Sequence, residues 1–327
     1  MRKSQKKILG LILVTSLIIT ALSGCSPKSS ASAGSKILYC TFDLTDTFRG
    51  MLAQEAVKAG KNNGVTVDIY EGEPTISDQV EKIKKAKSEG YGAIIIRPAE
   101  ASAALQLEIA AEDLPMVFVN SQPDDSVLKK DRFVFAGSME TEAGELQAEW
   151  AMKALKNKSP INVVVMKGEK GHSATVGRTR AIKYTFDDAG IEAHYVFTDY
   201  GDWLYDLSAK KMKAFLRTGQ DYDIIMCNND TMALGVISAL KEAGIDSKSI
   251  PICGVDATAD GCAAIEDGDM DFTVMQNSEG QSTAAVKAAL NMMNGKSVTS
   301  LEGATPDGKY VLVPFEAVDA TNVSKYH

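Results

Sequence analysis

Short apolar runs alternate along the chain with longer stretches whose apolar residues recur at helical spacing. The runs predict strands over Lys36–Phe42, Val65–Tyr70, Ala93–Ile96, Met116–Val119, Arg132–Ala136, Ile161–Met166, Ala193–Thr198, Asp223–Cys227, Ile250–Val255, Phe272–Met275 and Tyr310–Pro314. The stretches between them predict helices that include Phe48–Asn62, Ile76–Glu89, Thr141–Lys156, Ala174–Asp188, Tyr205–Thr218, Met232–Ala243 and Ser278–Met293. Strands that alternate with helices of this length indicate βαβ units and parallel sheets, an α/β fold.

The number of strands favours two lobes over one sheet. About eleven strands are more than a compact open sheet of this kind holds, and unbroken apolar strands such as Ala93–Ile96 suit a sheet covered on both faces. We therefore expect two doubly wound parallel-sheet lobes joined by a multi-crossing hinge. The N-terminal lobe would take residues 36–136 plus 277–298, and the C-terminal lobe residues 137–276 plus 299–327. The chain would cross near 135–138, 275–277 and 296–309.

Composition and charge exclude several classes of protein. Hydrophobic residues make up 45% of the chain and charged residues 24%, which is typical of a globular protein. A net charge of −8 argues against nucleic acid as the main partner, because binding to phosphates needs clustered Lys and Arg. The three histidines are too scattered to form a His-rich metal site, so we expect no metal and no cofactor.

The N-terminus has the pattern of a targeting segment. A basic start is followed by a mostly apolar run, Ile8–Leu22, which is short for a membrane span and suits a signal peptide. The run ends in Leu22-Ser23-Gly24-Cys25, which resembles the bacterial lipoprotein cleavage box. We expect a signal peptide over 1–24, a lipid on Cys25, a flexible tether over 25–35, and a soluble extracytoplasmic protein held at the cell membrane by that anchor. An ordinary secretory signal with a chance Cys is the alternative.

Four further cysteines, Cys40, Cys227, Cys253 and Cys262, show no disulfide spacing. The first three lie in apolar runs, so we interpret them as small buried hydrophobic residues. The compartment permits disulfides, and the sequence leaves their oxidation state open.

Polar and aromatic residues recur where predicted strands end. Ligands of open α/β sheets bind at the carboxyl ends of strands, so residues from both lobes would meet in one cleft. Carboxylates, amides and guanidinium groups suit the hydroxyls of a sugar, and an aromatic ring suits the apolar face of a pyranose. The residues at these ends include Asp46, Phe48, Arg97, Gly168–His172, Asn228–Asp230, Asp256 and Gln276.

These residues lie in segments that resemble the periplasmic sugar-binding proteins of ABC transporters. The chain is similar to the ribose/galactose group of that family, and most similar to its glucose/galactose-binding members. The resemblance implies the type I periplasmic binding protein fold and covers nearly all of the chain after the targeting segment. The matching segments are Asp46–Phe48, Val117–Asn120, Gly168–His172 with Arg178, Asp202-Trp203, Asn228–Gly235, Gly254–Ala257 and Val311–Asp319.

The resemblance also implies roles for individual residues. Phe48 and Trp203 would sandwich the sugar ring. Hydrogen bonds to its hydroxyls would come from Asp46, His172, Arg178, Asn229 and Asp256. Three positions depart from the hexose-binding pattern: Arg97 and Gln276 each replace an Asn, and Ala174 replaces an Asp. The family's calcium loop has no match at Lys156–Pro160, which lacks the carboxylates that Ca²⁺ needs.

Each residue also has a structural interpretation. Asp46 and Asn229 could be helix N-caps, and we assign Asp230 to that structural role. Phe48 and Trp203 could be core or surface aromatics, His172 a plain loop residue, Arg178 a surface charge and Asp256 a turn residue. Arg97 could pair with an acid such as Glu100, and Gln276 could be a hinge residue.

No enzyme motif is complete. The segment Asn294–Ser297 lacks the first Gly of a P-loop, and Gly171–Thr175 lacks the final Gly of a nucleophile elbow. The sequence therefore predicts a monomeric binding protein that captures a monosaccharide for an ABC permease. A sensor that presents a sugar, sugar acid or signalling furanose to a chemoreceptor or histidine kinase is the alternative. The identity of the ligand, and whether it is neutral or anionic, stay open.

Overall fold

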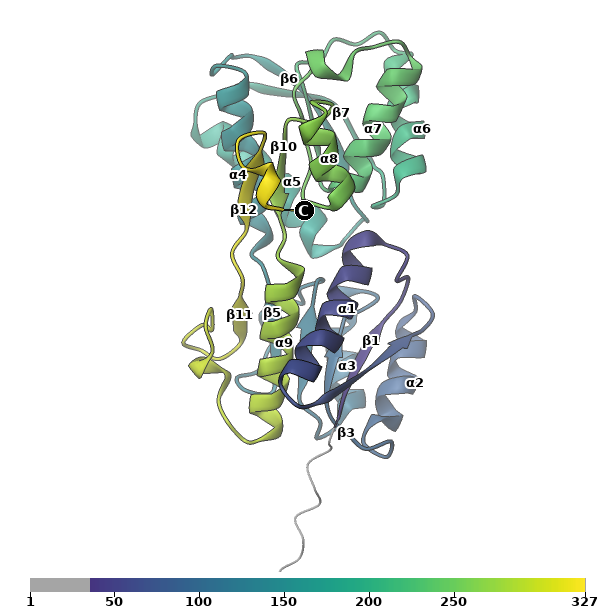
Figure 1. Ribbon diagram of the computed structural model, residues 1–327, viewed down its shortest axis with the longest axis vertical. Coiled ribbons are helices and arrows are strands. Elements are labelled where there is room, and N and C mark those ends of the chain that lie inside the picture. Colours follow the sequence, from purple (N-terminus) through teal and green to yellow (C-terminus); the bar gives the residue numbers. More distant parts are fainter. Residues whose placement is uncertain (1–35, 327) are drawn as a thin grey trace, which may run out of the picture. The chain divides into compact units, whose positions relative to one another are not determined.

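The computed structural model describes residues 36–326, which build two six-stranded sheets (Figure 1). The first sheet contains β1 (Lys36–Thr41), β2 (Thr66–Glu71), β3 (Tyr91–Ile96), β4 (Met116–Val119), β5 (Phe133–Gly137) and β11 (Tyr310–Leu312), in the order β11-β5-β4-β3-β1-β2. The second contains β6 (Ile161–Lys167), β7 (Ala193–Tyr200), β8 (Ile224–Cys227), β9 (Ile252–Cys253), β10 (Phe272–Met275) and β12 (Glu316–Asp319), in the order β12-β10-β9-β8-β6-β7. The strands of each sheet pair in parallel, apart from β12, which runs antiparallel to β10.

Helices cover both faces of each sheet. The first sheet packs with α1 (Thr47–Asn62), α2 (Ile76–Ala86), α3 (Ala104–Ala111) and α9 (Ser278–Met293). The second packs with α4 (Glu140–Ala154), α5 (Ser173–Asp188), α6 (Tyr205–Leu216), α7 (Asp230–Glu242) and α8 (Ala259–Glu266). This is the predicted fold of two doubly wound lobes, and the structure confirms it.

The strand residues explain why helices are needed on both sides. Successive side chains of a strand point to opposite faces. In β1, Ile37 packs with α1 and α9, whereas the next residue, Leu38, packs with α2 and α3. Both side chains are almost completely buried. A strand that is apolar at every position can be stable only in a sheet that is covered twice.

The chain passes between the lobes three times, and the last passage differs from the expectation. The first passage follows β5 and the second follows β10, as predicted. Residues 299–327 were expected in the C-terminal lobe as a whole. Instead β11 pairs with β5, with Tyr310 opposite Phe135, and the chain crosses only at residues 313–315. The reason is burial: Val311 lies in the core of the first lobe, and the Tyr310 ring meets the Phe135 ring edge-on.

The predictions for the N-terminus, namely the signal peptide, the lipid on Cys25 and the tether, fall outside the described residues. Among residues 36–326, no helix combines the length and the apolar character needed to cross a bilayer. All four cysteines in this part of the chain are buried and carry free thiols.

Candidate functional site

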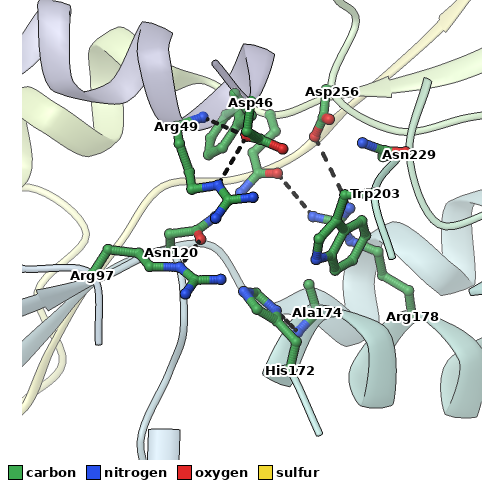
Figure 2. Close-up of a pocket in the computed structure, with 12 residues that line it drawn as sticks. Asp46, Arg49, Arg97, Asn120, His172, Ala174, Arg178, Trp203, Asn229 and Asp256 are labelled. Carbon is green, nitrogen blue, oxygen red and sulfur yellow. Dashed lines mark hydrogen bonds and ion pairs between the residues drawn. The ribbon is translucent and has the colours of Figure 1, made fainter. Parts of the chain in front are cut away.

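One cavity lies where the carboxyl ends of strands from both sheets meet. In the first sheet the chain runs from β1 outward to β2 on one side and to β3 on the other, and in the second sheet β6 has β7 and β8 on its two sides in the same way. The strand order therefore reverses beside β1 and beside β6, and ligands of open α/β sheets bind at such a point. The cavity is small, with a volume of about 30 Å³. Its lining residues are Asp46, Phe48, Arg49, Arg97, Asn120, His172, Ala174, Arg178, Trp203, Asn229, Asp256 and Gln276 (Figure 2).

All nine residues that the sequence singled out as ligand-binding therefore line the same cavity. Asp46 and Phe48 follow β1, Arg97 follows β3, His172 follows β6, Asn229 follows β8 and Gln276 follows β10. They reach one another because the carboxyl ends of both sheets face the same space. The structure brings the candidates together; their roles toward a ligand remain predictions.

Three lining residues begin helices and use only part of their side chain to do so. Asp46 Oδ1 accepts a hydrogen bond from the Arg49 amide at 2.8 Å at the start of α1. Asn229 Oδ1 accepts one from the Met232 amide at 3.0 Å at the start of α7. Within the described residues, Asp46 Oδ2 and Asn229 Nδ2 have no partner, so each cap keeps one polar atom for the cavity.

His172 caps α5 in the same manner. Its Nδ1 accepts a hydrogen bond from the Ala174 amide at 3.1 Å, so the proton of the neutral ring lies on Nε2. Burial holds the pKa of His172 well below its usual value, and the charges of Arg97, Arg178 and Arg49 lower it further. The imidazole is therefore a neutral group whose Nε2 is able to donate a hydrogen bond.

Arg97 is buried and enclosed by groups from both lobes. Its Nε donates to Asn120 Oδ1 at 3.4 Å, one terminal nitrogen donates to the Pro98 carbonyl, and the other meets Glu169 Oε2 at 3.2 Å. Its guanidinium also lies over the Phe42 ring, 4.3 Å from the ring centroid. Burial lowers the pKa of Arg97, and the Glu169 carboxylate acts in the opposite direction. The acid that pairs with Arg97 is thus Glu169, and not the neighbouring Glu100.

Arg178 is held by a network that leaves it little freedom. Its Nε donates to Glu140 Oε2 at 2.8 Å, and its terminal nitrogens donate to the Asn228 carbonyl at 2.6 Å and to Gln276 Oε1 at 2.8 Å. It is only 2% exposed, so it is not a surface charge. Because Oε1 of Gln276 is engaged, Gln276 has its amide nitrogen left as a donor.

Asp256 has few partners for a buried carboxylate. It is 5% exposed, and its nearest cation is Arg178 at 4.0 Å. Burial raises its pKa well above the usual value, Arg178 opposes that shift, and the nearby carboxylates of Asp230, Asp46 and Glu140 add to it. A carboxylate in this position would be stabilised by donors from a ligand.

The neighbouring acid, Asp230, has a structural role, but not the expected one: Asn229 caps α7, and Asp230 joins the start of that helix to Thr258 and Thr273. Its carboxylate accepts hydrogen bonds from the amide and hydroxyl of Thr258 and from the hydroxyl of Thr273. Burial raises its pKa to about 7, and these hydrogen bonds act against that shift. Asp230 does not line the cavity.

Two aromatic side chains, Phe48 and Trp203, complete the cavity wall, and both are nearly buried. The Trp203 ring meets the His172 ring edge-on, with the centroids 5.3 Å apart. Figure 2 shows Trp203 beside Arg178 and above His172. A flat apolar surface next to hydrogen-bonding groups is the arrangement that a sugar ring requires.

Two polar lining residues were not among the predicted binding residues. Asn120 lies in a matching segment and follows β4, so its place at a strand end was a usable signal. Arg49 contacts Asp46 Oδ1 through Nε at 3.3 Å. Its spacing of three residues from Asp46 on a helix was the signal available.

The arrangement can bind polar solutes by hydrogen bonds and one apolar face. Within residues 36–326, no cluster of three or more His, Cys, Asp or Glu side chains is placed to hold a metal ion.

Comparisons with known proteins identify the family. Residues 37–297 match the family model described as "Periplasmic binding protein domain". A putative rhizopine-binding protein from Rhizobium meliloti is 31% identical over 81% of this chain and 83% of the relative. A D-galactose/methyl-galactoside binding periplasmic protein from Haemophilus influenzae is 27% identical over 96% of this chain and 98% of the relative.

A solved structure agrees with this assignment. An ABC transporter solute-binding protein from Bacillus halodurans, with bound myo-inositol, superposes with a TM-score of 0.79. It is 26% identical, and the match covers 91% of this chain and 99% of that chain. With the family model covering most of its length, this chain belongs to the periplasmic binding protein family.

Proposed function

We propose that this protein captures a monosaccharide or a closely related ring polyol in the cavity and delivers it to an ABC permease. One observation carries the proposal: polar and aromatic side chains from both lobes converge on the same cavity. We infer a binding role and no catalytic one, because the family is one of binding proteins.

The chemistry of the lining supports a polyhydroxylated ring. Hydroxyl groups both donate and accept, and the lining offers both kinds of partner. Acceptors are the Asp46 and Asp256 carboxylates, and donors include His172 Nε2 and the amide nitrogens of Asn229 and Gln276. Phe48 and Trp203 supply apolar surface for the ring face. The relatives named for D-galactose and the structure with myo-inositol have ligands of this class.

A thermal-shift screen of hexoses, pentoses and inositols tests the proposal. A ligand at 100 times its dissociation constant should stabilise the protein by about 2.7 kcal/mol. For every hit, the variant Asp256→Asn should reduce the shift, because the carboxylate accepts from the ligand. The proposal fails if no polyol stabilises the protein, or if the hits stabilise wild type and Asp256→Asn equally.

We further propose that Cys25 carries a lipid that holds the protein on the outer side of the cell membrane. The basic start, the apolar run and the Leu-Ser-Gly-Cys segment support this anchor. In cells that make the protein, Cys25→Ala should move it from the detergent phase to the aqueous phase on partitioning. Equal partitioning of wild type and Cys25→Ala would argue for another form of attachment.

If the protein delivers its ligand to a permease, cells should need the protein in order to take up that ligand; a purely signalling protein would not be needed for uptake. Deletion of the gene should abolish uptake of the radiolabelled ligand found in the screen, and the wild-type gene should restore it. Normal uptake in the deletion strain would favour a sensory role.

A further inference from the structure

The cavity contains a pair of guanidinium groups, Arg49 and Arg97, on one of its sides (Figure 2). A pair of this kind would normally indicate a binding site for an anion, because Arg binds carboxylates strongly. The carboxylate in this case belongs to the protein. Glu169 Oε2 lies 3.2 Å from Arg97, and Glu169 Oε1 lies 3.8 Å from Arg49.

Glu169 reaches this position from the opposite lobe. Arg49 lies on α1 and Arg97 follows β3 in the first lobe, whereas Glu169 follows β6 in the second. A neighbouring contact also joins the lobes, since the Gln122 amide donates to Ser173 Oγ at 2.9 Å. The ion pair is therefore made when the cavity is closed.

The balance of charge around the guanidinium pair leaves no free cation for a ligand. Arg49 also meets Asp43 at 3.2 Å and Asp46 at 3.3 Å. The two guanidinium groups thus face three carboxylates, Asp43, Asp46 and Glu169. Arg97 is 2% exposed, and a charge at such depth needs a counter-ion. A ligand carboxylate would have to displace Glu169 or lie among like charges.

We propose that Glu169 is a specificity residue that makes the closed site select neutral polyols and reject their carboxylate counterparts. This inference rests on the proposed function, since it names the charge of the ligand that the same cavity accepts. Glu169 does not itself line the cavity, but it takes the contact with Arg97 that the carboxylate of a sugar acid would make. Arg97 stands where the hexose-binding pattern has an Asn. On this proposal its guanidinium group binds Glu169 and does not bind an anionic ligand.

Glu169→Gln tests the proposal by calorimetric titration with two matched pairs, D-glucose with D-glucuronate and D-galactose with D-galacturonate. Gln can still accept a hydrogen bond from Arg97, so closure is preserved while the charge is lost. Wild type should bind the neutral sugar of a pair more tightly than the acid. In Glu169→Gln this preference should shrink by about 10- to 100-fold, because the acid gains a charge-assisted contact with Arg97.

Two controls separate this effect from a general change in charge. Glu145→Gln makes the same change at an exposed position on α4 outside the cavity lining and should leave the preference as in wild type. The double variant Glu169→Gln with Arg97→Gln should lose the gained binding of the acid. Melting temperatures without ligand verify that each variant is folded.

The possible results distinguish the inference from the function on which it rests. An unchanged preference in Glu169→Gln, or gained acid binding that survives in the double variant, overturns the role of Glu169 and leaves sugar binding intact. Wild type that prefers the acid overturns it as well. Wild type that binds none of the four sugars contradicts the proposed function for hexoses and removes the basis of the inference.

Discussion

Trp203 is held in place by its own backbone and by a glycine. Its φ of 67° lies in the left-handed region, which is uncommon for a large residue and concentrates at functional sites. A Cβ on Gly168 would come within 2.0 Å of the Trp203 ring. The absence of a side chain at Gly168 therefore lets the ring lie against the loop after β6.

The two tryptophans should respond differently to ligand. Trp203 lines the cavity, whereas Trp150 packs against the core of the second lobe and stacks on Phe272, with 5.2 Å between the ring centroids. A ligand-induced change in fluorescence should vanish in Trp203→Phe and survive in Trp150→Phe. Trp203→Ala should weaken binding by about 1–3 kcal/mol, because Ala supplies little apolar surface. Wild-type affinity in Trp203→Ala would show that the ring does not stack on the ligand.

His172 should make the free energy of unfolding depend on pH. Its pKa is lowered in the folded protein, so between that pKa and about 6.5 the unfolded chain binds a proton that the folded protein does not. The contribution of His172 to stability is thus complete above about pH 6.5 and is lost as the pH falls, by up to about 1.4 kcal/mol per pH unit.

Urea unfolding at several pH values, compared with His172→Asn, measures this term. Asn keeps an acceptor for the cap of α5 and does not titrate. The variant should lose less stability than wild type between pH 7 and pH 5.5. Parallel pH profiles for the two proteins would mean that His172 takes up protons equally well in both states.

At the scale of elements, the helix starts explain why the sequence alone left roles open. Asp46 and Asn229 could each be a cap or a ligand residue, and in the structure each caps its helix with one atom and presents the other to the cavity. The two interpretations are therefore compatible. When a helix begins within a few residues of the end of a strand, its N-cap residue lies at the carboxyl edge of the sheet, where the cavity is.

Substitutions at Asp46 can separate the two tasks. Asp46→Ser keeps an oxygen that caps α1, so stability should stay near the wild-type value, but the second oxygen is lost. Affinity should fall by about 1–3 kcal/mol, which is roughly 5- to 150-fold. Asp46→Ala should lose a comparable affinity and also about 0.5–2 kcal/mol of stability, because the cap is gone. Titration and urea unfolding of both variants give these values, and full affinity in Asp46→Ser would remove Asp46 from the binding residues.

The elements were predictable because their hydrophobic patterns are strong. The parallel strands are apolar along most of their length, and the helices between them are long. β12 was not predicted, because Glu316 and Ala317 are both exposed and only Val318 is fully buried. The boundary after residue 298 was also wrong, since a three-residue strand such as β11 carries too little pattern to show which sheet it joins.

The lining of the cavity was predictable, because most of its residues follow the ends of predicted strands. The pairing of Arg97 with Glu169 was not predictable, because the two residues belong to different lobes and lie 72 positions apart in the sequence. Sequence patterns report neighbours on one element, and this contact exists only after both lobes have folded and closed.

At the scale of the whole binding unit, closure joins the lobes through protein groups and through the ligand. The Arg97–Glu169 ion pair and the Gln122–Ser173 hydrogen bond connect them directly. A ligand that contacts Asp46 in one lobe and Asp256 in the other adds a bridge that only the closed form provides, so it shifts the population toward that form.

Solution scattering should detect this shift. The radius of gyration should fall when the wild-type protein is saturated with the ligand identified in the screen. Trp203→Ala at the same ligand concentration should respond less, in proportion to its lower occupancy. A wild-type scattering profile that stays constant across the binding isotherm would contradict closure by the ligand.

The most direct test of the central claim is a crystal structure with that ligand. The account predicts a ring with its face on Trp203 and with hydroxyls hydrogen-bonded to Asp46 in the first lobe and to Asn229 and Asp256 in the second. Glu169 should remain paired with Arg97 in the same crystal. A ligand bound outside this cavity, or one that contacts the residues of a single lobe, would contradict the account.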